Sequence, residues 1–464
     1  MTADERSPEP AKQGLLRPTI IVPAILVFLV LAALVLWKLP AILLNDWLAG
    51  LTVDDSVVRL AVGNAAQVVL FSLGGVIAIV GVGLSLLRYG LERETDARDR
   101  SKEVSRVREL AEQRSIEAER ELRARFANAV TLLSDPDKPT TRQAGVYALA
   151  ALADDWLIFG RPDERQVCID VLCGYLRSSW DPTRLGGENE RSIRSAGFDV
   201  IGTHLRDEEG RPTWHGARFN LRGVLVDFDC NWRSIDTRDT TIDLTGMRLV
   251  GGELDCDGAN FSSGQIRLQN ADVSDGRLAF TNARFSGTVL DLRGSQFSGG
   301  LLVFVGSAFS GGTTDLRGIE ISSPARASFS RAEFVGGKVD FAEIKMTGGH
   351  FDFISAIYTD GDVRFENARF LGGTVSFVGS LFDGAQVDFG NAGFLGSIVS
   401  FMTADFLSGD VSFQRAVFGG GIVAFDVSQR HHVATFVDAE FSGAVDTSGV
   451  ELTAPRPGKL PSGA

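Results

Sequence analysis

Residues 363–374 read VRFENARFLGGT, and this twelve-residue unit decides the fold. Val363 and Phe365 are separated by one polar residue, Ala368 and Phe370 by another, and Gly372-Gly373 closes the unit. In an extended chain, residues two apart point to the same side, so each pair should face inward. Glycine accommodates the positive φ that a tight corner requires. The unit therefore predicts two short strand segments followed by a corner.

The unit recurs through the C-terminal half of the chain as two series of large apolar residues, the second five positions behind the first. The first series is Leu244, Cys256, Leu268, Phe280, Leu292, Phe304, Leu316, Phe329, Phe341, Phe353, Phe365, Phe377, Phe389, Phe401, Phe413 and Phe425. The second is Leu249, Phe261, Val273, Phe285, Phe297, Phe309, Ile321, Phe334, Met346, Tyr358, Phe370, Phe382, Phe394, Phe406 and Phe418. Each unit can bury its apolar side only against neighbouring units. We therefore expect a parallel β-solenoid of stacked coils.

Both series are assigned to the interior, because their period matches the inward positions. A fully buried Phe or Leu contributes about 1.5 to 3 kcal/mol. This assignment excludes the rings as a base-stacking platform for nucleic acid. The predicted core ladder is Leu292, Phe304, Phe341, Phe353, Phe365, Phe377, Phe389, Phe401, Phe413, Phe425, Phe370, Phe382, Phe394, Phe406 and Phe418.

The period breaks twice. Thirteen residues separate Leu316 from Phe329, and eleven separate Phe425 from Phe436. We expect a bulge or loop at the first break and a slipped terminal coil at the second.

Composition favours separate modules in this 464-residue chain, whose 52 glycines and 31 phenylalanines concentrate in the repeats. Residues 244–452 hold 24 Asp and Glu against 14 Lys and Arg, a net charge of −10. This balance disfavours direct nucleic-acid binding. The four cysteines lack CxxC spacing and are interpreted as buried thiols in a reducing compartment, with no metal site at Cys168 and Cys173.

Two uncharged apolar runs, 19–37 and 61–87, predict a transmembrane helical hairpin with an external loop over 38–60. A signal peptide is the alternative for the first run, but no small-residue cleavage site follows it. Seven basic residues lie between Arg88 and Arg108, which predicts a plasma-membrane protein with both termini cytoplasmic, the tail 1–18 included. The lipid bilayer would then be a partner.

Residues 88–125 carry 11 Lys and Arg with 10 Asp and Glu and predict a charged juxtamembrane helix. A thin apolar stripe along it could form a coiled-coil seam, so a homodimer through residues 61–125 is weighed against a solvated spacer helix. Residues 126–212 show four helical patterns, beginning with FANAVTLL, and predict a HEAT-like helical domain. The solenoid is assigned to 213–452, and 453–464 to a disordered tail.

The runs TRQAGVYALAALADDW, RQVCIDVLCGYLR and RSIRSAGFDVIGTHLR, with repeats such as FVGGKVDF, resemble membrane-anchored pentapeptide-repeat proteins of actinobacteria. The likeness covers roughly residue 60 to residue 452. This chain departs from simple pentapeptide repeats because its spacing alternates five and seven. The resemblance implies an uncharacterised membrane protein and brings no catalytic residues. It also implies a right-handed parallel β-solenoid, four-sided, with two twelve-residue units per coil, which gives about eight coils and a length of about 40 Å at ~4.8 Å per strand layer.

No phosphate loop, nucleophile elbow or HExxH pattern occurs, so no catalytic residue, cofactor site or metal site is assigned. The polar residues beside the apolar series are expected to form exposed ladders: Asp340, Asp352, Asp388, Asp410, Arg364 and Ser376. The leading prediction is a non-enzymatic, membrane-tethered scaffold that binds an unknown cytoplasmic protein. The alternatives are a DNA mimic that binds topoisomerase, and a metal-dependent activity near His431 and His432.

Overall fold

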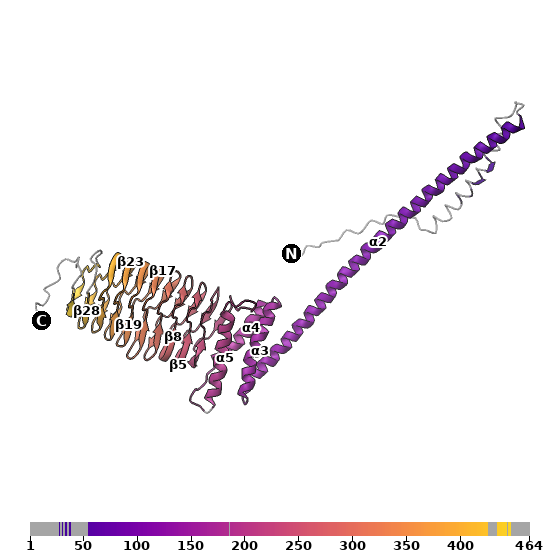
Figure 1. Cartoon of the computed structure of the whole chain (residues 1–464). Helices are drawn as coiled ribbons and strands as arrows, with labels where there is room; N and C mark the ends of the chain where they lie inside the picture. The colour runs from indigo at the N-terminus through magenta and orange to yellow at the C-terminus, as the bar shows by residue number, and fades with distance from the viewer. Residues whose placement is uncertain are drawn as a thin grey trace, which may run out of the picture. The chain divides into compact units, whose positions relative to one another are not determined.

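The structure, a computed structural model, describes residues 54–184, 186–425, 434–442 and 444–446, and also residues 27, 30, 33, 34, 37 and 38. The chain divides into two compact units, Met1–Ser115 and Ile116–Ala464 (Figure 1).

The charged segment belongs to a single helix of 79 residues, α2 (Asp55–Leu133). The sequence had suggested a separate helix for FANAVTLL. In the structure these residues are the last part of α2, because no break precedes Phe126. Asp135 ends this stretch by accepting hydrogen bonds from the backbone N–H groups of Asp137 and Lys138. Its pKa is lowered by these two bonds.

The predicted transmembrane hairpin is wrong for this structure. Nowhere among the described residues does a helix contain a stretch long and apolar enough to span a bilayer. The prediction for 61–87 relied only on the length of the run and on its lack of charge. The other predicted span, 19–37, lies almost wholly outside the described residues.

Three helices follow α2: α3 (Pro139–Ile158), α4 (Pro162–Leu176) and α5 (Gly187–Leu205). Pro139 and Pro162 begin their helices, where the missing N–H of proline costs nothing. Gly145 lets α3 approach the end of α2 closely, because a Cβ there would lie 2.5 Å from the backbone nitrogen of Leu133. The buried side of these helices includes Trp156, which is almost fully enclosed.

The C-terminal region is a β-solenoid of about nine turns with parallel strands, which confirms the predicted repeat architecture. Two sheets run along it. The first contains β1 (Arg218–Asn220), β4 (Thr241–Asp243), β6 (Asn260–Phe261), β7 (Gln265–Arg267), β9 (Arg284–Phe285), β10 (Val289–Asp291), β13 (Ala308–Phe309), β14 (Thr313–Asp315), β17 (Glu333–Asp340), β20 (Ile357–Arg364), β23 (Leu381–Asp388) and β26 (Asp405–Ser412).

The second sheet lies on the other side of each coil. Its strands are β2 (Leu225–Asp227), β3 (Cys230–Asn231), β5 (Arg248–Asp255), β8 (Asp272–Ala279), β11 (Gln296–Phe297), β12 (Leu301–Val303), β15 (Glu320–Ile321), β16 (Arg326–Ser328), β18 (Lys345–Met346), β19 (His350–Asp352), β21 (Arg369–Phe370), β22 (Thr374–Ser376), β24 (Gly393–Phe394), β25 (Ile398–Ser400), β27 (Val417–Phe418), β28 (Ile422–Ala424), β29 (Glu440–Phe441) and β30 (Ala444–Asp446).

Register shows that one coil holds two twelve-residue units. Val375 pairs with Val399, and Phe382 with Phe406, so each partner lies two repeat units further along the chain. The first corner of a unit is a four-residue turn closed by the Ala368 N–H and the Phe365 carbonyl, with Asn367 at φ 59°. The second corner needs glycine at Gly373, whose φ is 81° and whose added Cβ would lie 2.5 Å from the Gly349 oxygen.

Both period breaks are absorbed without loss of stacking. The coil that contains the first break is longer than its neighbours by a single position, since Thr313 pairs with Lys338, yet Phe304 and Phe329 still stack at 4.7 Å. At the second break Val417 pairs with Glu440, so that coil is shorter by a single position.

The helices α3 to α5 close the N-terminal end of the solenoid. The Gln166 side-chain amide donates to the Arg218 carbonyl at 2.7 Å and accepts from the Arg218 N–H at 3.0 Å, so it completes the backbone hydrogen bonds of β1. Trp232 donates its indole N–H to the Phe198 carbonyl at 2.9 Å. This packing covers strand edges that would otherwise invite pairing with other chains.

Candidate interaction surfaces

The predicted core ladder residues all lie in the interior, each with at most 5 % of its surface exposed. Four aromatic stacks run through successive coils. One joins Phe353, Phe377 and Phe401 at 4.8 and 4.7 Å, and another joins Phe365 and Phe389 at 4.6 Å. Such offset parallel stacking is a favourable aromatic geometry. The ladder therefore builds the rod and leaves only the outward positions for recognition.

The polar residues beside the ladder do not form simple exposed rows, which corrects the sequence interpretation. Asp340 is only 4 % exposed and Ser376 is also buried, whereas Asp410 is exposed; Asp352, Asp388 and Arg364 are intermediate. The aspartates that precede a corner cap it: Asp340 accepts from the Ala342 N–H at 3.1 Å and Asp388 from the Gly390 N–H at 2.8 Å. Their role is local turn stabilisation.

Charges along one corner of the solenoid alternate in sign. Arg293 contacts Asp291 at 2.7 Å and Asp315 at 3.5 Å, and Arg317 contacts Asp315 at 2.7 Å. Burial alone would raise the pKa of Asp291, but hydrogen bonds from Arg293 outweigh it and lower that pKa. A DNA mimic needs a dense run of uncompensated negative charge. This corner is instead neutralised by its own arginines.

Outward apolar residues gather near the C-terminal end, on strands of the second sheet and in the turns that follow β21 and β24. We name Leu371, Leu395, Ile398 and Ile422 the C-terminal apolar face; they are 40 to 53 % exposed. Ile398 and Ile422 are paired residues of adjacent coils. Leu395 follows Leu371 by one coil, as the backbone bond from Leu395 N to the Phe370 carbonyl shows.

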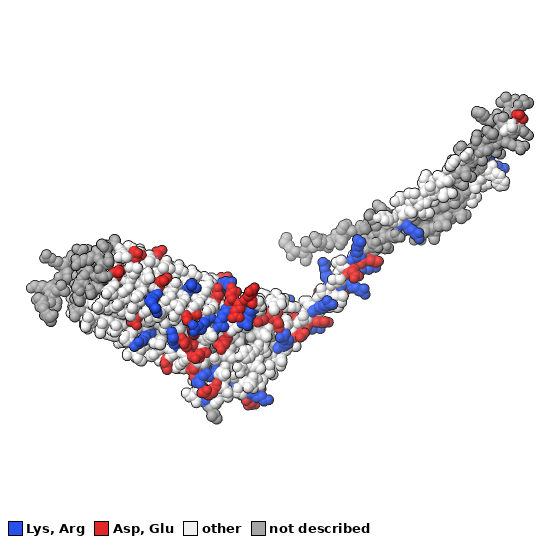
Figure 2. All heavy atoms as spheres, in the orientation of Figure 1, with Lys and Arg blue, Asp and Glu red and all other residues white. Residues whose placement is uncertain are grey.

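Charge is sparse around this face. From residue 371 to residue 404 the only charged residues are Asp383 and Asp388, and both belong to β23 on the other sheet. In earlier coils the column that contains Ile398 and Ile422 holds Leu301, which is 37 % exposed, then Arg326, His350 and Thr374. In Figure 2, charged side chains likewise gather toward the N-terminal half of the solenoid and thin out toward its C-terminal half. Contiguous exposed apolar surface on a protein commonly marks an interaction site.

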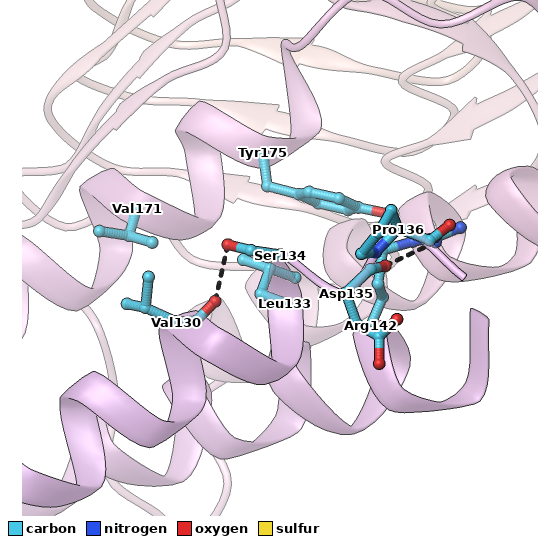
Figure 3. A pocket seen from close by; sticks show the side chains of 8 residues that line it. All are labelled: Val130, Leu133, Ser134, Asp135, Pro136, Arg142, Val171 and Tyr175. Carbon is cyan, nitrogen blue, oxygen red and sulfur yellow. Dashed lines mark hydrogen bonds between the residues drawn. The ribbon is translucent and has the colours of Figure 1, made fainter. Parts of the chain in front are cut away.

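A pocket of about 410 Å³ lies between the end of α2, α3 and α4 (Figure 3). Its walls include Val130, Pro136 and Val171, and its polar lining includes Arg142 and Tyr175. The Tyr175 hydroxyl donates to Glu190 at 2.9 Å, and Arg142 bonds the same carboxylate at 3.1 Å. Burial, with help from Glu190, raises the pKa of Tyr175 to about 12. The phenol therefore stays protonated at neutral pH. These groups hydrogen-bond one another, but the buried Nε of Arg142 has no hydrogen-bond partner among the described residues.

Behind this pocket, Arg194 forms a buried contact set that the sequence analysis missed. Its Nε donates to Glu190 at 2.8 Å, and its guanidinium lies between the rings of Tyr175 and Trp180 at 5.3 and 5.1 Å. The only sequence signal was the i,i+4 spacing of Glu190 and Arg194. Burial lowers the pKa of Arg194. The set ties α4 to α5, which is a structural role.

In the described part of the chain, no group of three or more His, Cys, Asp or Glu residues is arranged to hold a metal ion. His431 and His432 lie outside the described residues. The four cysteines are buried and free, and burial raises the pKa of Cys168 and of Cys173 to about 12.

Comparison with known proteins found no matching family model, no matching curated protein and no matching solved structure. The architecture supports a β-solenoid repeat protein.

Proposed function

We propose that this protein is a non-enzymatic interaction scaffold whose C-terminal apolar face binds a protein partner. The observation that carries the proposal is the separation of charged from apolar outward side chains along the solenoid. The coils near the helices are charged, whereas β22, β24, β25, β27 and β28 of the second sheet contain no charged residue; charge returns in the last coil with Glu440 and Asp446. Solenoids use extended, rigid surfaces of this kind for recognition.

This separation is informative because the interior of the solenoid restricts only the inward positions. Inward positions must keep large apolar residues, but an outward position can hold any residue that suits a strand. Arg326 and Ile398 occupy equivalent outward positions on the same column, and only the later one is apolar. Ile398 and Ile422 leave about half of their surface exposed, at 51 % and 53 %, so that half contributes nothing to the fold of a monomer. Its burial by a partner would contribute about 1 to 2 kcal/mol per side chain.

A photo-crosslinking residue placed at Ile398 tests the proposal, with the same residue at Arg326 as the matched control. We expect a discrete crosslinked partner from position 398 and none from position 326. The double variant I398D/I422D should lose that partner, and R326D should keep it. Equal products from both positions, or a partner retained by I398D/I422D, would contradict the proposal.

A further inference from the structure

The pocket between the end of α2, α3 and α4 is a slot with one flat side (Figure 3). The ring of Tyr175 forms that side, and Ser134, just after α2, lies across from it. Val130 and Val171 line one end of the slot, and Arg142 lies at the other. All of these residues belong to the same compact unit. The volume of about 410 Å³ is large enough for a small molecule, since ligand pockets start at ~300 Å³.

The apolar part of the lining fits a planar ring. Val130, Val171 and Tyr175 are partly buried and pack against the hydrophobic core. The Tyr175 hydroxyl is held by Glu190 at 2.9 Å, and the guanidinium of Arg194 lies 5.3 Å from the centroid of the tyrosine ring. These contacts fix the orientation of the ring. An aromatic ligand can therefore stack on the side that faces the pocket, which is a favourable geometry when two rings are offset and parallel.

The polar end of the pocket has an unused hydrogen-bond donor. Arg142 donates from Nη1 to the carbonyl oxygens of Asp135 at 2.9 Å and Pro136 at 3.2 Å. Its Nη2 donates to Glu190 at 3.1 Å. Its buried Nε has no partner among the described residues, and an N–H group that lacks an acceptor costs free energy. Because Nε is enclosed, a ligand oxygen reaches it only if this side chain shifts, and the bond to Pro136 is the longest that the shift would break.

Charge at this end favours a carboxylate on the ligand. The guanidinium groups of Arg142 and Arg194 share a single carboxylate, that of Glu190. The other carboxylate of the lining belongs to Asp135, and it already accepts hydrogen bonds from two backbone N–H groups of the turn that follows α2. Those bonds, with a smaller effect from the charge of Lys138, lower the pKa of Asp135. The two guanidinium groups therefore lack a second carboxylate of their own, which a ligand can supply.

We propose that this pocket binds a small aromatic carboxylate, with its ring stacked on Tyr175 and a carboxylate oxygen accepting a hydrogen bond from Arg142. The site lies in the helical region, so the inference is independent of the C-terminal apolar face. The ligand would contact the end of α2, α3 and α4 at once. Binding should therefore stabilise the packing of these three helices, because a ligand that binds only the folded state shifts unfolding to higher temperature.

Two naphthalene probes test the proposal on the full chain. Naphthalene-2-carboxylate carries the expected charge, and (naphthalen-2-yl)methylamine has the same ring with a positive charge. Binding is measured from the NMR signals of the naphthyl protons. We expect a Kd of about 1 mM or lower for the carboxylate, and at least tenfold weaker binding of the amine.

Substitutions at the pocket locate the binding. V171F places a ring inside the pocket and should weaken binding of the carboxylate at least tenfold. V167F is the matched control, because Val167 is 44 % exposed and lies outside the pocket lining on the same helix. R142K keeps the positive charge but removes the Nε donor, so it should weaken binding of the carboxylate about tenfold and leave binding of the amine unchanged. Thermal unfolding of each variant checks that the helices still fold.

Three results would overturn the proposal. They are equal or tighter binding of the amine, no saturation by the carboxylate at about ten times the expected Kd, and equal binding of the carboxylate by V171F and V167F. If R142K does not fold, the comparison of V171F with V167F still decides whether the probe occupies this pocket.

Discussion

Tyr358 is the single tyrosine in a stack that otherwise consists of phenylalanines, and its substitution Y358F should stabilise the protein. The ring is fully buried between Phe334 and Phe382, with ring centroids 4.6 Å away on each side. Its hydroxyl oxygen has no hydrogen-bond partner in the described part of the chain. Burial alone raises the pKa of this phenol well above its usual value.

The expected gain follows from the cost of leaving a buried polar group unpaired, about 1 to 3 kcal/mol. Y358F removes that hydroxyl and keeps the stack, because the rings have the same shape. The converse variant F382Y adds a hydroxyl one coil further on, so it should lower stability by a similar amount.

Long repeat arrays often unfold in several steps, so one midpoint for the whole chain is a poor measure. Hydrogen exchange at the amides of β17, β20 and β23 is the better assay, since it reports opening of the coils concerned. Protection there should rise about fivefold or more in Y358F and fall in F382Y. Unchanged or reduced protection in Y358F would refute the reasoning, and would mean that the hydroxyl is satisfied, for instance by an internal water.

Three further predictions concern the cap of a corner, the thiols and the end of the rod. D291N should cost about 1 kcal/mol at pH 7, because a charge-assisted bond becomes neutral. Because the folded pKa of Asp291 is lowered, its contribution to the free energy of unfolding is present above about pH 4 and is lost as pH falls through the folded pKa. On acid titration, D291N should therefore lose less stability than wild type. D410N, at an exposed aspartate, is the control. The four cysteines should resist iodoacetamide at pH 8 until the protein unfolds, because only the thiolate reacts and the pKa of Cys168 is raised to about 12 by burial; rapid native labelling would contradict this. Q166A should leave both backbone groups of Arg218 unpaired and speed hydrogen exchange of that amide at least tenfold, whereas the same change at the exposed Gln414 should have no effect there.

Prediction from the sequence succeeded where one physical rule dominated. The inward positions of the repeat, such as Phe365, follow from period two and from the need to bury large rings. The parallel stacking of coils was predicted as well, but burial alone leaves the number of units per coil open, and the pairing of Val375 with Val399 establishes two. The residue at which each solenoid strand begins or ends is then set by the corner glycines and the short turns.

Prediction failed where the outcome depended on neighbours distant in sequence. Asp340 was expected at the surface, but its capping bond to Ala342 and the ion pair with Lys338 place it almost entirely inside. The side-chain amide of Gln166 hydrogen-bonds a strand 52 residues away, and no local sequence pattern predicts such a contact. The membrane prediction rested on two uncharged runs alone, and the described residues include no helix that is long and apolar enough to span a bilayer.

The two period breaks show which part of a coil is free to change. The lengthened coil and the shortened coil both keep their aromatic stacks, at 4.7 Å for Phe304 and Phe329 and 4.9 Å for Phe413 and Phe436. The additional or missing residue is absorbed between strands, because a one-residue shift within a strand would turn every side chain to the opposite face. The interior thus fixes each strand but tolerates variation at corners and outward positions. Differences among the outward surfaces of successive coils are therefore not required by the fold, and partner binding is our proposal for why the C-terminal apolar face is uncharged.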